Sequence, residues 1–81
     1  MKIEEFKQLV ETGREMEFNY NGKRYSITYG YIDSKYVISF CEFYKETTEV
    51  DNFEKLISIS RDNVTIKEMI ETINDNDIDV F

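Results

Sequence analysis

Histidine, proline, tryptophan and alanine are absent from this chain, and cysteine occurs once, as Cys41. Without an imidazole the chain cannot build a serine or cysteine triad, a histidine pH switch or the usual zinc sites. A single cysteine allows no intrachain disulfide, which fits a reducing compartment. These absences exclude most hydrolase chemistry of small proteins, so we expect a protein that is not an enzyme and uses no cofactor.

Long apolar runs are also missing. No stretch approaches the roughly 20 apolar residues that span a membrane. Residues 1–10 are amphipathic and contain two acids and two bases, whereas a secretory signal is basic and then apolar. We therefore expect a cytoplasmic protein of a bacterial host cell. A length of 81 residues with 41% hydrophobic residues predicts one domain, 1–81, with a single core.

The net charge of −7 is unevenly distributed along the sequence. Residues 1–45 contain seven acids and seven bases, whereas residues 46–81 contain ten acids and three bases. The whole net charge therefore belongs to the second part of the chain. Such an asymmetry is compatible with a basic partner, or with solubility alone.

Two local patterns define the start of the fold. Residues 3–12 carry apolar side chains at helical spacing, with charged residues between them. Alternating apolar residues then flank Asn21-Gly22, a pair that favours a two-residue hairpin turn because both positions need positive φ. With these residues as the loop, Phe18 faces Tyr25, and the apolar side chains of both strands share one face.

A turn at residues 33–35 is followed by a strand at residues 36–41. That strand is apolar on both sides, which predicts a position at the centre of the sheet. We expect residues 43–44 to extend it and residues 47–50 to add a short fourth strand.

Capping patterns predict two further helices. Asp51 with Glu54 resembles a capping box that begins one helix, and Thr65 with Glu68 is a capping box for the last helix. Residues 74–77 end the last helix, and the acids at the end of the chain favour a solvated acidic tail. The pattern does not decide whether Ile78, Val80 and Phe81 pack on the domain. The predicted fold class is α+β: a short N-terminal helix, a three- to four-stranded antiparallel meander, and two C-terminal helices on one sheet face.

The acids of the second part of the chain are the main candidates for partner binding. Carboxylates on a rigid scaffold can imitate the phosphates of nucleic acid and attract a basic groove, although acids can also simply solvate helices. We expect the partner to be a basic bacterial protein, such as an RNA-guided nuclease, rather than nucleic acid or a membrane. The protein itself would be a monomer or a homodimer. The predicted acidic face comprises Glu49, Asp51, Glu54, Glu68, Glu71, Asp75, Asp77 and Asp79.

An aromatic face of the sheet is the alternative binding surface. The six tyrosines all lie in the predicted sheet region, and Tyr25, Tyr29 and Tyr31 could recognise another protein. With Lys23 and Arg24 nearby, the same rings could stack single-stranded bases. The net charge of −7 opposes that third hypothesis because nucleic-acid binding is dominated by attraction to phosphates.

Asp75, Asp77 and Asp79 have the spacing that begins a calcium-binding loop. The match stops there, because Val80 stands where the loop needs glycine and no closing glutamate follows. We therefore assign no metal site to these residues.

The segment from Glu11 to Ile27, ETGREMEFNYNGKRYSI, resembles the opening of small acidic α+β proteins of Firmicutes phages and mobile elements. Those proteins have a short helix ending in glycine, an E-h-x-Y-x-G-K-x-Y hairpin (h, hydrophobic), an aromatic strand and a closing helix. The resemblance extends over most of the chain, through residues 52–57 and 65–73. Its motifs are structural and bring no catalytic residue. It implies an anti-CRISPR or other anti-defence inhibitor that acts as a DNA mimic on a nucleic-acid-binding surface.

Overall fold

The computed structural model describes residues 1–81, and its first element is the helix α1 (Ile3–Glu11). Phe6 and Val10, one turn apart, are its buried residues, as an amphipathic pattern requires. The helix ends one residue earlier than predicted. Thr12 follows it as the C-cap, and Gly13 adopts a φ of +73°, which glycine accepts without strain.

The hairpin of β1 (Met16–Tyr20) and β2 (Lys23–Ile32) has the predicted register. Asn21 and Gly22 form its loop with φ values of +52° and +77°, as a two-residue turn of this kind requires. Phe18 lies opposite Tyr25, and the other pairs also follow the prediction. The turn residues therefore fix which side chains of both strands enter the core.

The sheet has five strands, one more than the upper end of the prediction, in the order β4-β3-β2-β1-β7. β3 (Lys35–Glu42) and β4 (Thr47–Val50) occupy the predicted positions along the chain. β2, not the apolar strand β3, is the middle strand, because β7 adds a neighbour to β1 on the far side. Residues 43–44 do not extend β3: they form a turn in which Tyr44 has a φ of +68°.

The fifth strand, β7 (Ile78–Val80), comes from the segment predicted to be a solvated tail. A 3₁₀ turn, η1 (Asp75–Asp77), leads into it, and β7 pairs antiparallel with β1. Ile78 lies opposite Phe18 and is only 8% exposed. The segment is therefore not a solvated tail, and the question that the sequence left open is answered: β7 pairs with β1 and Ile78 belongs to the core.

Between β4 and β7 the chain forms the helix α2 (Phe53–Ile57), a small hairpin and the helix α3 (Ile66–Thr72). Asn52, not Asp51, caps α2, because its side chain accepts a hydrogen bond from the backbone N–H of Lys55. The hairpin of β5 (Ser60–Arg61) and β6 (Val64–Thr65) was not predicted. The capping box of Thr65 and Glu68 at α3 is confirmed.

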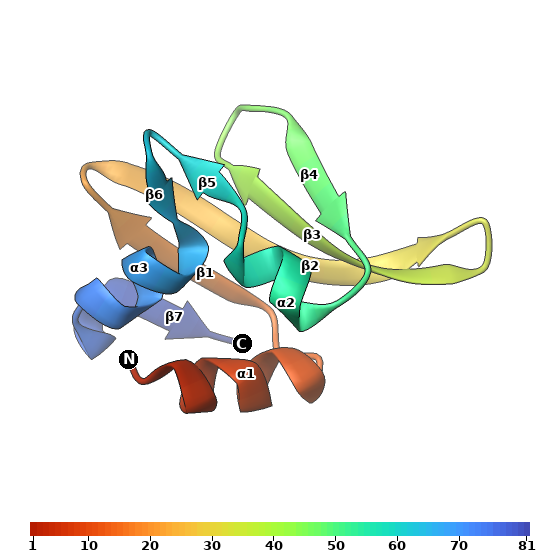
Figure 1. Cartoon of the computed structure of the whole chain (residues 1–81), viewed down its shortest axis with the longest axis horizontal. Coiled ribbons are helices and arrows are strands. Elements are labelled where there is room, and N and C mark those ends of the chain that lie inside the picture. Colours follow the sequence, from red (N-terminus) through yellow and green to blue (C-terminus); the bar gives the residue numbers. More distant parts are fainter.

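The molecule is an α+β structure in which the three helices cover one face of the sheet (Figure 1). Fifteen buried residues form one core between the two layers, and none of them is polar or charged. Tyr25 and Phe40 stack at its centre, with ring centroids 5.2 Å apart. The other face of the sheet has no layer packed on it, and none of its side chains is buried.

The hairpin of β2 and β3 projects beyond the rest of the sheet (Figure 1). β1 pairs with β2 only as far as Ile27, and β4 pairs with β3 only from Ile38 onward. Residues 28–37 therefore have no strand neighbour outside the hairpin of β2 and β3, and we call them the arm. Both edges of this two-stranded ribbon are without a neighbouring strand, and such ribbons are marginally stable in water without packing partners.

Candidate partner-binding surfaces

The predicted acidic residues do not form one continuous face. Glu49 in β4 and Asp79 in β7 lie at opposite edges of the sheet, on the face without helices. Asp51 and Glu54 flank the start of α2. The other four lie on α3 and η1, on the helical side of the molecule: Glu68, Glu71, Asp75 and Asp77.

Glu68 and Asp51 have partners beside the starts of the helices α3 and α2. The Glu68 carboxylate accepts hydrogen bonds from the backbone N–H and the hydroxyl of Thr65, which caps α3. Asp51 forms an ion pair with Lys55 at 3.0 Å, and the Lys55 ammonium lowers the pKa of this exposed carboxyl. Reversing the charge of Glu68 would therefore also weaken the cap of its helix, which costs about 1 kcal/mol.

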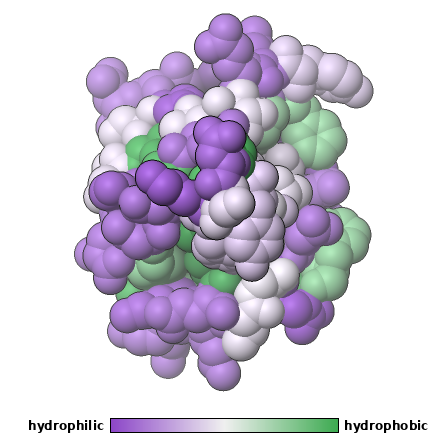
Figure 2. Space-filling view, turned by 90° about the vertical axis from the view of Figure 1, so that its right-hand side faces the viewer, coloured by the Kyte–Doolittle hydropathy of each residue, from purple (hydrophilic) through white to green (hydrophobic).

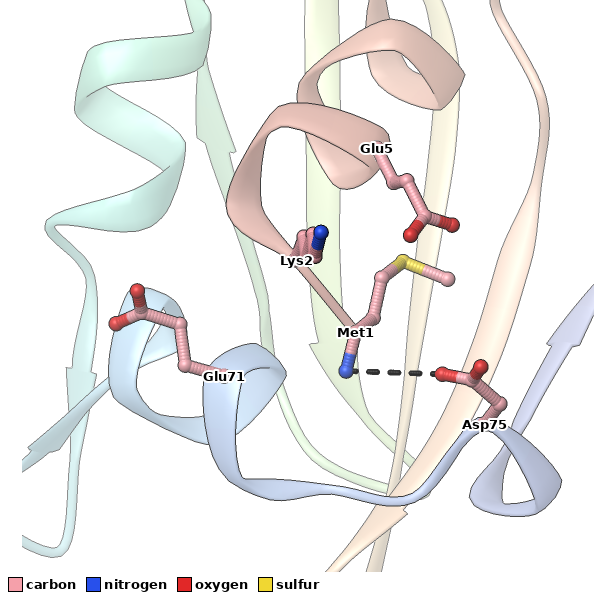
Figure 3. Close-up of a pocket in the computed structure, with 5 residues that line it drawn as sticks. All are labelled: Met1, Lys2, Glu5, Glu71 and Asp75. Atoms are coloured by element: carbon pink, nitrogen blue, oxygen red, sulfur yellow. Dashed lines mark ion pairs between the residues drawn. The ribbon is translucent and has the colours of Figure 1, made fainter.

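A pocket of about 480 Å³ lies where the start of α1 meets α3 and η1 (Figure 3). The carboxylates of Glu5, Glu71 and Asp75 surround it, together with Met1 and Lys2. The terminal ammonium of Met1 lies 3.7 Å from Asp75 and donates hydrogen bonds to two carbonyl groups near the end of α3. Acids of the first helix thus lie beside those of the last.

The helical segments carry most of the net negative charge of the molecule. Residues 1–15, 51–58 and 65–77, which contain α1, α2, α3 and η1, carry ten acids and five bases. We call these residues the acidic layer. Its net charge is −5, and the remaining residues contribute only −2. Counting along the sequence missed the acids of α1, because nothing local indicates that this helix packs beside α3.

Two of the five bases outside the acidic layer, Lys23 and Arg24, form ion pairs with neighbouring acids. The Lys23 ammonium lies 2.5 Å from Asp62 and 3.6 Å from Glu42. Arg24 contacts Glu17 at 2.9 Å and Asp79 at 2.8 Å. These are the two bases that the nucleic-acid hypothesis requires, and both already have carboxylate partners. Within the acidic layer only Asp51 and Asp75 have a basic nitrogen within 4.0 Å.

The predicted tyrosine site is divided between the core and the arm. Tyr25 is 2% exposed, so its ring is not available to a partner. Tyr29 is half-buried, donates a hydrogen bond to the carbonyl of Arg14 at 2.7 Å, and has its pKa raised by burial. Tyr31 is 74% exposed and packs edge-on against Tyr36, whose ring also stacks on Tyr29.

Tyr36 also marks a groove that the sequence did not indicate. The groove has a volume of about 300 Å³ and lies where the end of α1, the start of α2 and β3 meet. No local signal could reveal it, because its residues come from three elements distant in sequence. Its lining residues are Val10, Glu11, Tyr36, Ile38, Asp51, Asn52, Phe53 and Glu54.

The three aspartates with calcium-loop spacing do not converge. Asp79 faces Arg24 on the open face of the sheet, whereas Asp75 lies beside Met1 on the helical side. The structure brings together no group of three or more acidic or cysteine side chains that could hold a metal ion. These aspartates therefore contribute negative charge to the surface and are not arranged as the ligands of one metal ion.

The fold and these surfaces define a small α+β protein with an acidic helical layer and a projecting aromatic arm. None of its helices has the length and apolar character needed to cross a membrane. Comparison with protein-family models, with curated proteins and with solved structures finds no significant match in any of the three.

Proposed function

We propose that this protein is a non-enzymatic binding protein whose acidic layer docks on a basic surface of another protein. The observation that carries the proposal is the net charge of −5 on the helical segments, against −2 on all other residues. A layer of one sign attracts a surface of the opposite sign and accelerates association. The target class is a basic nucleic-acid-binding surface, such as the channel of a bacterial RNA-guided nuclease, which the protein would inhibit by occupation.

The availability of the carboxylates supports this proposal. Glu4, Glu5 and Glu71 are exposed, and none of them has a hydrogen bond or ion pair through its side chain. Their charges are therefore free to interact with a partner. On the strands, by contrast, Lys23 and Arg24 neutralise the acids closest to them. The helical segments thus combine unpaired carboxylates with the larger share of the net negative charge.

A pair of matched variants tests this proposal. The layer variant is Glu4→Gln with Glu5→Gln and Glu71→Gln, and the control variant is Asp33→Asn with Glu46→Gln and Glu49→Gln. Each removes three carboxylate charges from exposed positions, so the net charge of the two variants is equal. Tagged proteins would capture partners from a bacterial lysate that contains defence nucleases, at about 50 mM and about 500 mM salt, with mass spectrometry of the retained proteins.

We expect the wild type and the control variant to retain the same basic protein at low salt and to lose it at high salt. The layer variant should lose it already at low salt, because the carboxylates that attract the partner have been removed. At high salt charge attraction is screened over a few ångströms for every variant. Equal retention by the layer and control variants would contradict the proposal.

A second candidate function has its own supporting observation. The arm exposes Tyr31, Ile32 and Tyr36 at 74%, 46% and 42%, and an exposed aromatic ribbon is typical of a protein-protein contact. In this alternative the protein is an accessory interaction domain that binds through the arm. In the same lysate experiment, this alternative predicts one partner that the wild type retains at both salt concentrations and that the variant Tyr31→Ser does not retain. That result would favour binding through the arm over binding through the acidic layer.

A further inference from the structure

The groove beside Tyr36 combines an apolar floor with a charged rim. Val10 and Ile38 are each 3% exposed and Phe53 is 9% exposed, so these side chains form a floor with little water contact. The carboxylates of Glu11, Asp51 and Glu54 belong to the lining. Figure 2, which faces the end of the molecule from which the arm projects, shows hydrophobic side chains in recesses between hydrophilic ones.

The groove exists because two elements end early. β4 stops at Val50 and the chain turns into α2, while β3 continues toward the arm without a neighbour on that side. Tyr36 therefore stands at the edge of the groove with 42% of its surface exposed. The helices are too short to cover it, since α1 ends at Glu11 and α2 begins at Phe53.

The charge of the groove is negative and only partly compensated. Lys55 pairs with Asp51 at the rim, whereas Glu11 and Glu54 have no basic nitrogen within 4.0 Å. The chain itself already places a cation near the floor, because the Lys7 ammonium lies 5.9 Å from the centre of the Phe53 ring. An amine is thus held near this aromatic ring, as expected for a cation-π contact.

We propose that this groove binds an arginine side chain presented by the partner, an inference that rests on the proposed docking of a basic surface. The aliphatic part of an arginine can lie along Val10 and Phe53 while its guanidinium remains at the rim. There the flat cation can stack on the exposed ring of Tyr36 and donate hydrogen bonds to Glu11 and Glu54. Lysine offers the charge without the planar donor group, so arginine fits the combination of ring and carboxylates better.

The test is a titration of the ¹⁵N-labelled protein, followed by NMR, with three peptides that differ at one position. The probes are acetyl-Leu-Arg-Leu-amide, the same peptide with lysine, and the same peptide with citrulline, which keeps the shape of arginine but lacks the charge. We expect saturable shifts at the amides of Glu11, Tyr36 and Glu54, with affinity decreasing from arginine to lysine to citrulline.

Two variants with equal charge separate the groove from the rest of the acidic layer. Glu11→Gln with Glu54→Gln should weaken arginine-peptide binding about tenfold, because two charge-assisted contacts are removed. Glu4→Gln with Glu5→Gln should change it by less than about twofold, because these residues lie outside the groove. Tyr36→Ser should weaken the arginine peptide more than the lysine peptide, because it removes the stacking surface.

Several results would overturn the inference. These are equal effects of the two charge variants, equal affinity for arginine and citrulline, or shifts confined to residues outside the groove. Arginine binding that disappears on dilution together with self-association would assign the groove to a second copy of the chain instead, and would also overturn it. These results are independent of the lysate experiment, because the layer variant used there changes no residue of the groove. The arginine site can therefore fail while the docking of the acidic layer is confirmed, and the reverse.

Discussion

At the scale of single residues, the ion pair of Lys23 and Asp62 joins two turns that are distant in sequence. Lys23 follows the turn between β1 and β2, and Asp62 lies in the turn between β5 and β6, with their charged atoms 2.5 Å apart. The Asp62 carboxylate raises the pKa of Lys23, and Lys23 lowers the pKa of Asp62. The charged form of each residue is thus favoured in the folded state.

This pair predicts a specific pH dependence. Because the folded pKa of Asp62 is lowered, the stabilisation is present above the ordinary carboxyl pKa of about 3.9 and is lost as the pH falls through the lowered value. The raised pKa of Lys23 means that its contribution is present below about pH 10.4 and is lost above the folded pKa. Asp62→Asn should therefore be less stable than wild type at pH 7, by a small amount because both groups are exposed.

Urea unfolding of wild type and Asp62→Asn at pH 7 and at about pH 3 measures this difference. The gap between their unfolding free energies should shrink at the lower pH, where Asp62 begins to be protonated. The conservative control is Asp33→Asn, which changes a carboxylate in another turn that forms no ion pair. A gap between wild type and Asp62→Asn that is unchanged or larger at low pH would contradict the assignment.

At the scale of elements, the sequence was most informative where a local pattern is sufficient. Asn21-Gly22 predicted both the hairpin and its register, since positive φ at both positions leaves one alignment of the strands. The capping box of Thr65 similarly predicted the start of α3. The hairpin of β5 and β6 was missed because each strand has only two residues, too few for a visible alternation.

The strand β7 could not be predicted because its stability comes from a partner about 60 residues earlier in the chain. Its three residues form no pattern that differs from an acidic tail, and only the exposed edge of β1 makes a strand of them. When β7 is paired with β1, Ile78 becomes part of the buried core. The apolar residues of β7 therefore have a structural role, which a count of charges along the sequence does not indicate.

Ile78→Ala should destabilise the protein by about 2–4 kcal/mol, because it removes a side chain that is 92% buried and leaves a cavity in the core. Hydrogen exchange should accelerate at the amides of β1, which β7 otherwise covers. The matched change Phe81→Ala, at a side chain that is 61% exposed, should stay within about 0.5 kcal/mol of wild type. If both variants unfold at the same urea concentration as wild type, β7 does not contribute to the core.

At the scale of the whole molecule, the helical segments carry a net charge of −5, whereas the strands and their turns carry −2. The sequence assigned the whole net charge to residues 46–81, but it did not show where these acids lie in space. In the structure the acids of α1 lie beside those of α3, whereas Glu49 and Asp79 lie on the opposite face of the sheet. That correction needs tertiary contacts between α1 and α3, which no local pattern contains. The candidate groove likewise depends on how three elements meet.

Hydrogen-deuterium exchange of the protein, alone and bound to the partner retained at low salt, tests the central proposal most directly. We predict slower exchange on binding at the helical segments, above all the exposed turns of α1 and α3, with no change in strands β3 and β4. Protection confined to the arm would support the accessory interaction domain instead. Protection of the strands without change in α1 or α3 would contradict the account that the acidic layer binds the partner.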